Sequence, residues 1–377
     1  MAFATEAAEA LGARGVDVTL FATDLGDVPG SGQWRRVELE ELPPSVDELD
    51  LHLFPVRPPR RLANSPAMSA RLERVAAEFD VVHIHSLWLF PQFAAQRAAQ
   101  RAGVPYVVSP HGALDPYLRR HGRVRKAITD LAWQRRMLAN ATMLHITTAQ
   151  EGELIADIAP RTPREIVPVG ISSERLLAPG DASRFRRKHL GGRSGDIVLF
   201  LGRITYKKGI DVLIRSFAHV TRELGDATLV VAGPDDENLF PQLQEIVQAE
   251  GLEERVVFPG PLYREDRADA FAASAAWALS SYTENFGVAV MEALAVGLPT
   301  IVSPEVNIAD AIRRSRAGVV AGLDPAEFGR ALLNLLRDHE LRASLAERAR
   351  AFAAGYDWSA VAPRLEAMYR RALSMGR

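Results

Sequence analysis

The chain has 377 residues, which is more than one hydrophobic core usually organises, so we expect two domains. Hydrophobic residues make up 47% of the sequence and charged residues 24%, and the net charge of −2 lacks the basic excess of a general nucleic-acid-binding protein. The absence of cysteine excludes disulfides, thiolate zinc sites and thiol nucleophiles. With neither a long apolar stretch nor a secretion signal in the sequence, we expect a cytoplasmic protein.

The first half of the chain alternates segments of helical period with short apolar runs. It opens with an expected helix over Ala2–Ala13, which ends before Gly15. Expected strands lie at Val16–Ala22, Val81–Ile84, Tyr106–Ser109, Met143–Thr147 and Glu165–Val169. Expected helices lie at Ser69–Glu78, Pro91–Ala102, Arg123–Asn140 and Ala149–Ile158.

The second half repeats this alternation. Expected strands lie at Ile197–Gly202, Thr228–Ala232, Arg255–Pro259, Trp277–Ser280, Thr300–Ser303 and Gly318–Ala321. Expected helices lie at Gly209–Glu223, Leu239–Glu250, Arg264–Ala273, Gly287–Val296 and Ala326–Leu336, with a last one at Ser359–Met375. Strands that are apolar throughout and alternate with helices predict parallel sheets covered on both faces.

These patterns predict a division into four parts. Residues 1–175 form an N-terminal doubly wound domain, 176–195 a linker rich in Gly and Arg, 196–357 a second doubly wound domain, and 358–377 a helix that crosses back to the first. A doubly wound domain ordinarily opens with a strand and a Gly-rich turn, whereas this sequence opens with a helix. We therefore expect that the first strand of the N-terminal domain is missing from the sequence.

A cationic loop follows the first strand of the second domain. Gly202 ends that strand, Arg203 and Lys208 lie in the loop, and a helix begins near Gly209. The carboxyl ends of parallel strands meet at the ligand-binding edge of a sheet. Because a guanidinium forks onto phosphate oxygens and an ammonium supplies a compact charge, this pair suits a diphosphate, although two surface cations remain the alternative.

A second segment places two carboxylates around the start of a helix. Glu284 comes just before the helix, Gly287 lies at its expected start, and Glu292 lies inside it, about 12 Å away if all eight residues are helical. The helix N-terminus favours an anion, and carboxylates accept hydrogen bonds from vicinal hydroxyls. Glu292 lies in a helix that is apolar nearly all round, where an unpaired charge is costly, so a binding role is favoured over a surface ion pair.

These two motifs carry a family resemblance. The pattern G-R-x4-K-G at Gly202–Gly209 followed by E-N-F-G-x4-E at Glu284–Glu292 resembles the retaining, nucleotide-sugar-dependent glycosyltransferases of family 4. The resemblance extends over most of the chain, including Val82–His85 and Pro110–Leu114. It implies the GT-B fold, in which two Rossmann-like α/β domains face a central cleft.

The resemblance also implies roles for particular residues. Arg203 and Lys208 bind the diphosphate and stabilise the leaving group, Glu284 reaches the donor sugar, and His111 faces that sugar from the other domain. These are the implied catalytic residues. The implied donor-binding residues are Glu292 for the ribose, with Phe286, Gly287, Asn285 and Gly202.

No residue is expected to hold a metal or to act as a covalent nucleophile. The sequence contains no D-x-D metal clamp, and protein cations can neutralise the diphosphate, so we predict neither a metal nor another cofactor. The retaining reaction of the family runs on one face of the sugar, with the leaving phosphate taking the acceptor proton. The two glutamates therefore differ from the acid and nucleophile of a glycosidase.

Two further features concern the first domain. His83 and His85 are two residues apart on one strand and so share a face. With no third ligand to make a metal site, we interpret His83 as cleft lining or packing and place His85 on the acceptor side. The Arg119–Arg136 region is strongly basic and could contact the anionic inner face of the cell membrane. A solvated helical face is the alternative for this region.

The sequence thus predicts a glycosyltransferase that moves a sugar, with retention, from a nucleotide diphospho-sugar to a glycan or lipid-linked acceptor in bacterial surface polysaccharide assembly. No nucleic-acid partner is expected. A GT-B epimerase or hydrolase would instead consume the donor without an acceptor, and a weakened binding protein would hold the donor without transfer.

Overall fold

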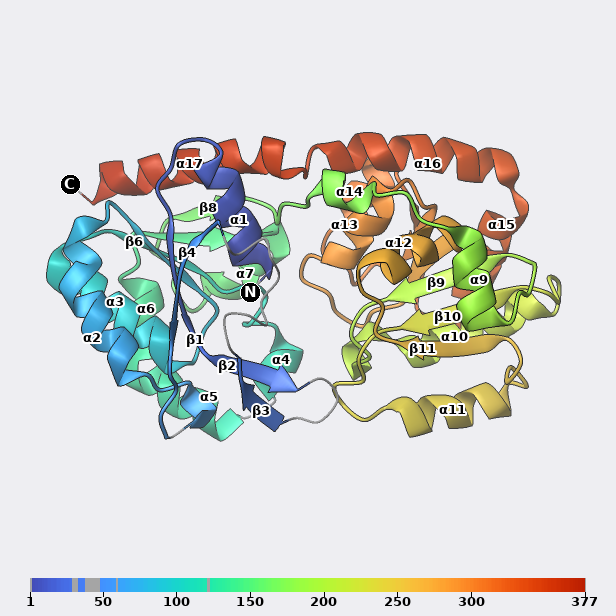
Figure 1. Cartoon of the computed structure of the whole chain (residues 1–377), viewed down its shortest axis with the longest axis horizontal. Coiled ribbons are helices and arrows are strands. Elements are labelled where there is room, and N and C mark those ends of the chain that lie inside the picture. Colours follow the sequence, from blue (N-terminus) through green and yellow to red (C-terminus); the bar gives the residue numbers. More distant parts are fainter. Residues whose placement is uncertain (1, 29–32, 38–47, 59, 121–122, 377) are drawn as a thin grey trace. The chain divides into compact units, whose positions relative to one another are not determined.

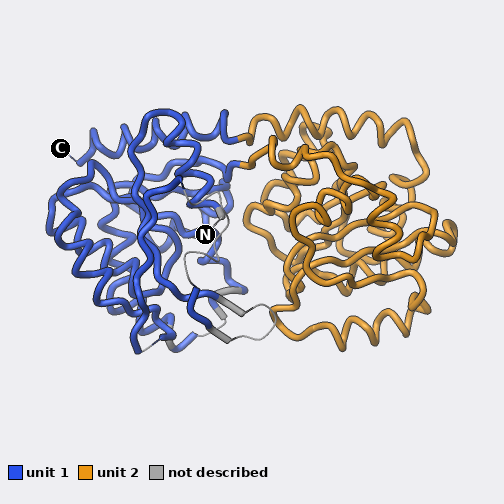
Figure 2. Tube along the Cα trace, in the orientation of Figure 1, with its two compact units in different colours: residues 1–28, 33–170, 358–377 blue, residues 29–32, 171–357 orange. Residues whose placement is uncertain are grey.

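The structure is a computed structural model that describes residues 2–28, 33–37, 48–58, 60–120 and 123–376. The chain folds into two compact units (Figures 1 and 2). Unit 1 combines Met1–Val28, Gln33–Gly170 and Trp358–Arg377, and the continuous segment Ile171–Asp357 belongs to unit 2. No helix of the described residues is long and apolar enough to span a bilayer.

Unit 1 is built on a four-stranded parallel sheet in the order β5-β6-β7-β8. A separate parallel pair joins β1 to β4, and an antiparallel pair joins β2 to β3. The strands are β1 (Thr19–Thr23), β2 (Leu25–Val28), β3 (Gln33–Arg36), β4 (Asp50–Phe54), β5 (Val82–His85), β6 (Tyr106–Ser109), β7 (Met143–Ile146) and β8 (Arg164–Ile166). Among the described residues, no strand joins the β1–β4 pair to the four-stranded sheet. The expectation of a missing first strand stays a prediction.

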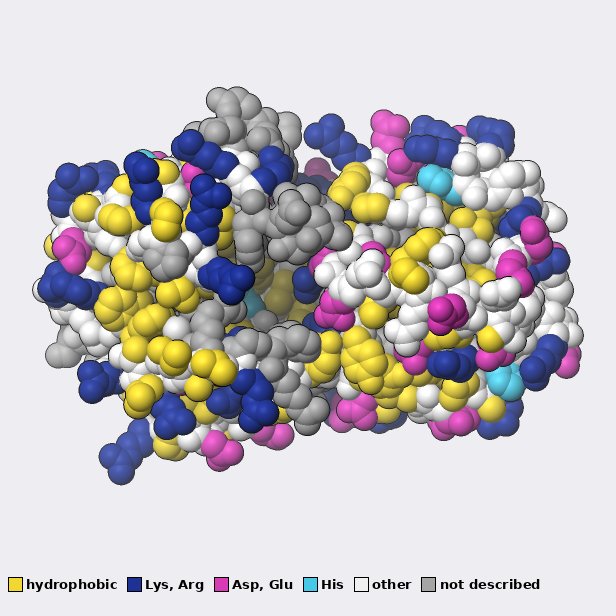
Figure 3. All heavy atoms as spheres, turned by 90° about the horizontal axis from the view of Figure 1, so that it is seen from below, with side chains coloured by type: hydrophobic (Ala, Val, Ile, Leu, Met, Phe, Trp, Pro, Cys, Tyr) yellow, Lys and Arg dark blue, Asp and Glu magenta, His cyan; other side chains and the backbone are white. Residues whose placement is uncertain are grey.

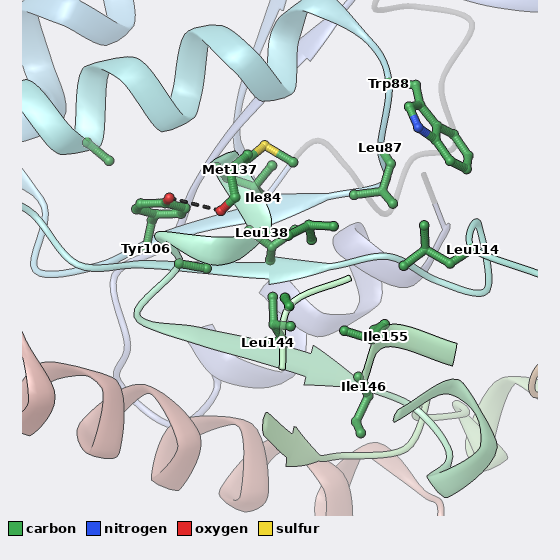
Figure 4. Packing of buried hydrophobic residues seen from close by; sticks show 14 residues of the cluster. Ile84, Leu87, Trp88, Tyr106, Leu114, Met137, Leu138, Leu144, Ile146 and Ile155 are labelled. Atoms are coloured by element: carbon green, nitrogen blue, oxygen red, sulfur yellow. Dashed lines mark hydrogen bonds between the residues drawn. The ribbon is translucent and has the colours of Figure 1, made fainter. Parts of the chain in front are cut away.

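Helices cover these strands. They are α1 (Ala2–Gly12), α2 (Pro66–Val75), α3 (Phe90–Ala102), α4 (Pro116–Arg120), α5 (Arg123–Thr129), α6 (Arg135–Ala139), α7 (Ala149–Ala156) and α17 (Trp358–Met375), with a π-helical turn, η5 (Asp130–Gln134), between α5 and α6. One core, drawn in Figure 4, packs residues of α6 against β5, β6 and β7, and the Tyr106 hydroxyl donates to the Met137 carbonyl within it.

The last helix belongs to unit 1 by its contacts. Its buried residues recur at helical spacing, at Val361, Leu365, Met368 and Ala372, and they form one core with residues of α1, β6 and β7. The ring of Trp358 fills the space beside Gly170 that any larger residue there would need.

Unit 2 contains one six-stranded parallel sheet in the order β11-β10-β9-β12-β13-β14. The strands are β9 (Ile197–Leu201), β10 (Thr228–Ala232), β11 (Val256–Gly260), β12 (Ala276–Leu279), β13 (Thr300–Val302) and β14 (Val319–Val320). The strand order reverses between β9 and β12, and in open α/β sheets ligands bind at the carboxyl ends of the strands beside such a reversal. The loops after β9 and β12 are those that carry the two predicted motifs.

The helices of unit 2 include several that we did not predict. The helices expected from the sequence are α10 (Ile210–Thr221), α11 (Phe240–Ala249), α12 (Arg264–Ala273), α13 (Val288–Ala295) and α15 (Pro325–Arg337). Those not expected are α8 (Ser173–Leu176), α9 (Ala182–Leu190), α14 (Ala309–Ser315) and α16 (His339–Ala354). The segment 176–195, predicted as a linker, contains α9, which packs on α12 within unit 2.

A charged pair fixes α9 to α12. The Asp269 side chain is 1% exposed; it accepts hydrogen bonds from the Arg184 guanidinium and from the backbone N–H of Asp181. The bond from Arg184 is the main cause that lowers the pKa of Asp269 below its ordinary value. Ionised Asp269 therefore stabilises the fold at neutral pH, and this contribution is lost as the pH falls through the lowered pKa.

Replacing Asp269 with Asn should lower the free energy of unfolding at pH 7 by roughly 1–3 kcal/mol, the usual cost of a hydrogen bond to a charged group. The difference between wild type and variant should shrink below about pH 4, measured by urea unfolding. Asp266→Asn on the same helix is the control, because Asp266 pairs with Lys188 in a more exposed position and should cost under about 1 kcal/mol. A wild-type–variant difference that does not change with pH would contradict the assignment.

Candidate functional site

The loop after β9 is shaped by glycine. β9 is entirely buried, and after it the chain makes a 3-10 turn at Tyr206–Lys208 before α10 begins. Gly209 has a φ of 61°, and a Cβ there would overlap the carbonyl oxygen of Ser280, at the end of β12. The Ser280 hydroxyl donates to the Gly209 carbonyl at 2.7 Å. The loops after β9 and β12 are thereby held against each other, which brings the two predicted motifs together.

A buried ion pair connects these motifs. The Lys208 ammonium donates to the carboxylate of Glu284, and the Lys207 ammonium lies 3.8 Å from the same carboxylate. Burial alone would raise the pKa of Glu284, but the attraction of Lys208, Lys207 and Arg203 and the hydrogen bond from Lys208 together outweigh it, so the pKa is lowered. Glu284 is consequently a carboxylate at neutral pH and can only accept hydrogen bonds.

The loop before α13 presents backbone N–H groups. Gly287 caps α13 with a φ of 77° and, as a glycine, has no side chain to accept a hydrogen bond from this helix end. Phe286 is buried and packs against the ring of Tyr356, which fixes the loop. A helix N-terminus without a side-chain cap favours an anionic ligand, because its first N–H groups have no acceptor within the helix.

The structure gives Glu292 a partner that we did not predict. Glu292 lies on α13 with its side chain 16% exposed and forms an ion pair with Arg267 of α12. The guanidinium of Arg267 also lies over the ring of Phe271. Arg267 belongs to no recognisable sequence motif. Its role becomes visible only through its ion pair with Glu292 in the folded structure.

The remaining predicted residues of unit 2 lie on the same sheet edge. The Arg203 side chain is 63% exposed and lies 3.1 Å from the Asp236 carboxylate. Asn285 accepts a hydrogen bond from the Asn307 amide at 3.3 Å. The carbonyl oxygen of Gly202 occupies the space that a Cβ on Gly233 would need, so the ends of β9 and β10 approach closely.

A pocket of about 270 Å³ opens beside this edge. It lies at the carboxyl ends of β9, β10 and β11, and its walls are mostly apolar. Its lining includes Ile204, Val231, Pro234, Phe240, Phe258 and Pro261. An apolar pocket next to a cationic loop suits a ligand that combines a flat ring with phosphates.

In unit 1, a directed chain of hydrogen bonds runs across the sheet. His145 Nε2 faces the carbonyl oxygen of Val167 at 2.8 Å and must donate to it. A neutral His145 then accepts from the Ser109 hydroxyl through Nδ1 at 2.7 Å. Ser109 in turn accepts from His83 Nε2 at 2.6 Å, and His83 Nδ1 accepts from the Tyr369 hydroxyl at 2.7 Å. Both ring nitrogens of His83 have partners in this series of hydrogen bonds, which gives His83 a structural role.

His85 and His111 form a second pair next to this chain. His85 Nδ1 lies 2.9 Å from His111 Nε2, and the two rings are stacked with centroids 5.2 Å apart. Burial lowers the pKa of His85 to about 3 and that of His145 to about 4, and it also lowers the pKa of His111. The imidazoles are therefore neutral at physiological pH. The structure places the predicted acceptor-side residue in contact with His111.

Glu151 holds the turn that carries His111. The His111 backbone has a φ of 53°, a conformation unusual for a residue other than glycine. The backbone N–H of Gly112 donates to the Glu151 carboxylate, which also accepts from the N–H and the hydroxyl of Thr147. Glu151 is 1% exposed. We did not predict this residue, although its position three residues after the helix cap Thr148 is a sequence signal for a helix start.

Replacing Glu151 with Ala should lower the free energy of unfolding by at least about 2 kcal/mol, because buried N–H groups of Gly112 and Thr147 lose their acceptor. Glu153→Ala is the matched control, since Glu153 is exposed on the same helix and should be nearly neutral. Urea unfolding measures both changes. Equal stability of the two variants would contradict the role of Glu151 in holding the turn.

Among the described residues, no group of three or more His, Asp or Glu side chains is placed to hold a metal ion. The expectation that the protein needs no metal stays a prediction.

Solved structures share this fold. HepE from Anabaena, solved with UDP and glucose, is 18% identical with a TM-score of 0.72, covering 86% of this chain and 87% of that one. WaaG, described as a glycosyltransferase involved in lipopolysaccharide biosynthesis, is 19% identical with a TM-score of 0.66, covering 97% and 94%. The two parallel-sheet units are those of a GT-B glycosyltransferase, as predicted.

Sequence comparison gives the family. Residues 2–170 match the glycosyl transferase 4-like domain, and residues 181–352 match glycosyl transferases group 1. A relative in Catenulispora acidiphila, named D-inositol 3-phosphate glycosyltransferase 1, is 30% identical over 373 residues, covering 91% of this chain and 87% of the relative. The chain belongs to the group 1 glycosyltransferases and is an enzyme that transfers sugars.

Proposed function

We propose that the protein transfers a sugar, with retention, from a nucleotide diphospho-sugar to a glycan or lipid-linked acceptor in the assembly of a bacterial surface polysaccharide. The observation that carries the donor part is the Lys208–Glu284 pair beside the N-terminus of α13, at the strand-order reversal of unit 2. This arrangement offers cations and N–H groups to a diphosphate and a carboxylate to hydroxyl groups.

Charge neutralisation of the leaving group is the proposed source of catalysis. The leaving nucleoside diphosphate gains negative charge as the glycosidic bond breaks, and preorganised cations lower the energy of that transition state. Lys208 is fixed by Glu284, whereas Arg203 is exposed and can move from Asp236 to a phosphate. In this proposal the protein's own cations act without a metal or another cofactor.

The two glutamates are proposed to recognise hydroxyl groups of the donor. Glu284 stays ionised and accepts hydrogen bonds from the sugar, and Glu292 accepts them from the ribose while Arg267 offsets its charge. The apolar pocket beside Ile204 and Phe258 is proposed to take the base. Neither glutamate acts as a nucleophile.

Two kinds of acceptor are supported by different observations. The similarity to WaaG, whose description names lipopolysaccharide biosynthesis, favours a glycan or lipid-linked acceptor and a location at the inner face of the cell membrane. The relatives named D-inositol 3-phosphate glycosyltransferases favour a small phosphorylated polyol as the second candidate. Offering both acceptors with UDP- and GDP-sugars decides between them by the product that forms.

Arg203→Ala should reduce kcat by roughly 10²-fold, because the variant loses a charge that stabilises the leaving group. Its fold should be unchanged, since the Arg203 side chain is exposed. The measurement is nucleoside diphosphate release from a panel of nucleotide sugars with acceptor. Arg222→Ala, an exposed arginine at the end of α10, is the control and should keep full activity.

Three other outcomes would each contradict one part of the proposal. If no UDP- or GDP-sugar binds the wild-type protein, the donor assignment is wrong. If Glu292→Gln binds every donor as tightly as wild type, the ribose assignment is wrong. If EDTA abolishes turnover and a divalent cation restores it, the metal-free mechanism is wrong.

A further inference from the structure

One helix of unit 1 exposes apolar side chains. The elements α5, η5 and α6 follow one another directly and form a continuous helix over residues 123–139. Val124, Ile128 and Leu131 are 76%, 62% and 84% exposed. Their spacing of four and then three residues places them on one face of the helix. We call these three residues the apolar stripe.

The opposite face of the same helix binds its unit through polar residues. Lys126 lies over the ring of Trp88, with its ammonium 4.3 Å from the ring centroid. Asp130 accepts from the Trp88 indole N–H at 2.8 Å, and Gln134 accepts from the Trp88 backbone N–H at 2.9 Å. These three residues follow one another at intervals of four, so they form a polar stripe that faces inward.

The helix is thus inverted relative to an ordinary surface helix, which buries its apolar face. Its orientation is fixed, because Met137 and Leu138 at its end are fully buried in the core shown in Figure 4. Rotating the helix to bury the apolar stripe would break the contacts with Trp88 and remove these two residues from the core. The contacts of the opposite face therefore keep the apolar stripe exposed.

The charged residues of this helix that are exposed carry one sign of charge. Arg123, Arg135 and Arg136 are exposed on the same helix. Within residues 116–139 the sequence has one carboxylate, Asp130, and it faces Trp88 rather than the outside. The face of unit 1 that borders α5 is turned to the viewer in Figure 3, where hydrophobic side chains lie among Lys and Arg.

We propose that the apolar stripe and its flanking arginines dock on the surface of an anionic phospholipid bilayer. Apolar side chains flanked by cations on one helical face are the features with which an interfacial helix enters the headgroup region. The arginines complement the negative lipid surface, and each such contact adds attraction that salt weakens. The inference deepens the proposed function, because it rests on an acceptor that is carried by the membrane.

Co-sedimentation of the full chain with vesicles tests the proposal. Vesicles of phosphatidylcholine with about one-third phosphatidylglycerol should bind the protein at least about 10-fold more strongly than phosphatidylcholine alone, in line with the attraction expected for several cations. Raising the salt concentration should weaken this binding. Absence of binding to the anionic vesicles would overturn the proposal.

Two sets of variants test the apolar stripe and the flanking arginines separately. The triple variant Val124→Ser, Ile128→Ser, Leu131→Ser should lose most of the binding, and so should Arg123→Gln, Arg135→Gln, Arg136→Gln. Leu177→Ser is the control, because Leu177 is also an exposed apolar residue but lies in unit 2. Wild-type binding by both triple variants would overturn the proposal. So would concentration-dependent self-association that the serine variant abolishes, which would assign the face to a second copy of the chain.

Donor binding without vesicles distinguishes this inference from the proposed function. The serine variant should bind the donor sugar nucleotide as wild type does, since its substitutions lie outside unit 2. If the wild-type protein binds vesicles but no nucleotide sugar, the proposed function fails alone. If it binds the donor but no vesicles, the docking inference fails alone.

Discussion

The buried ion pair between Lys208 and Glu284 is the constraint on which the site of unit 2 depends. It joins the loops after β9 and β12, and those strands are neighbours only because the strand order reverses there. Burial by itself raises the pKa of such a carboxylate. The lysines keep Glu284 ionised, and Gly209 allows the close approach that the pairing requires. Gly209, Lys208 and Glu284 therefore depend on one another, and the sequence motifs alone do not show this dependence.

In unit 1, by contrast, the buried histidines are neutral. Four histidines gather beside its sheet, and burial lowers the pKa of each of them. Hydrogen bonds to Ser109, Tyr369 and a backbone carbonyl use the ring atoms of two of them. His111 is presented on a turn that a buried carboxylate holds. Unit 2 thus contains fixed charges, whereas unit 1 contains neutral hydrogen-bonding groups.

Much of the fold could be predicted from the sequence, because most buried strands here are uninterrupted apolar runs, as in Thr228–Ala232. The strand Asp50–Phe54 escaped notice because it is short and alternates polar with apolar residues, and α16 because Arg, Ala and Glu dominate it. The motif residues of unit 2 were found because ligand chemistry concentrates in short loops. Arg267 and Tyr369 could not be found, since their roles depend on partners in distant segments. The outward apolar stripe was missed because helical period alone does not say which face is buried.

The return of α17 to unit 1 has a consequence for how the chain folds as it is synthesised. Leu365 and Met368 are fully buried in a core that also contains residues of α1, β6 and β7. The residues of unit 2 that lie between Ile171 and Asp357 all leave the ribosome before α17 does. Domains generally fold as units during synthesis, starting from the N-terminus. Here unit 1 cannot complete its core before α17 has been made, and α17 follows Ile171–Asp357 in the chain.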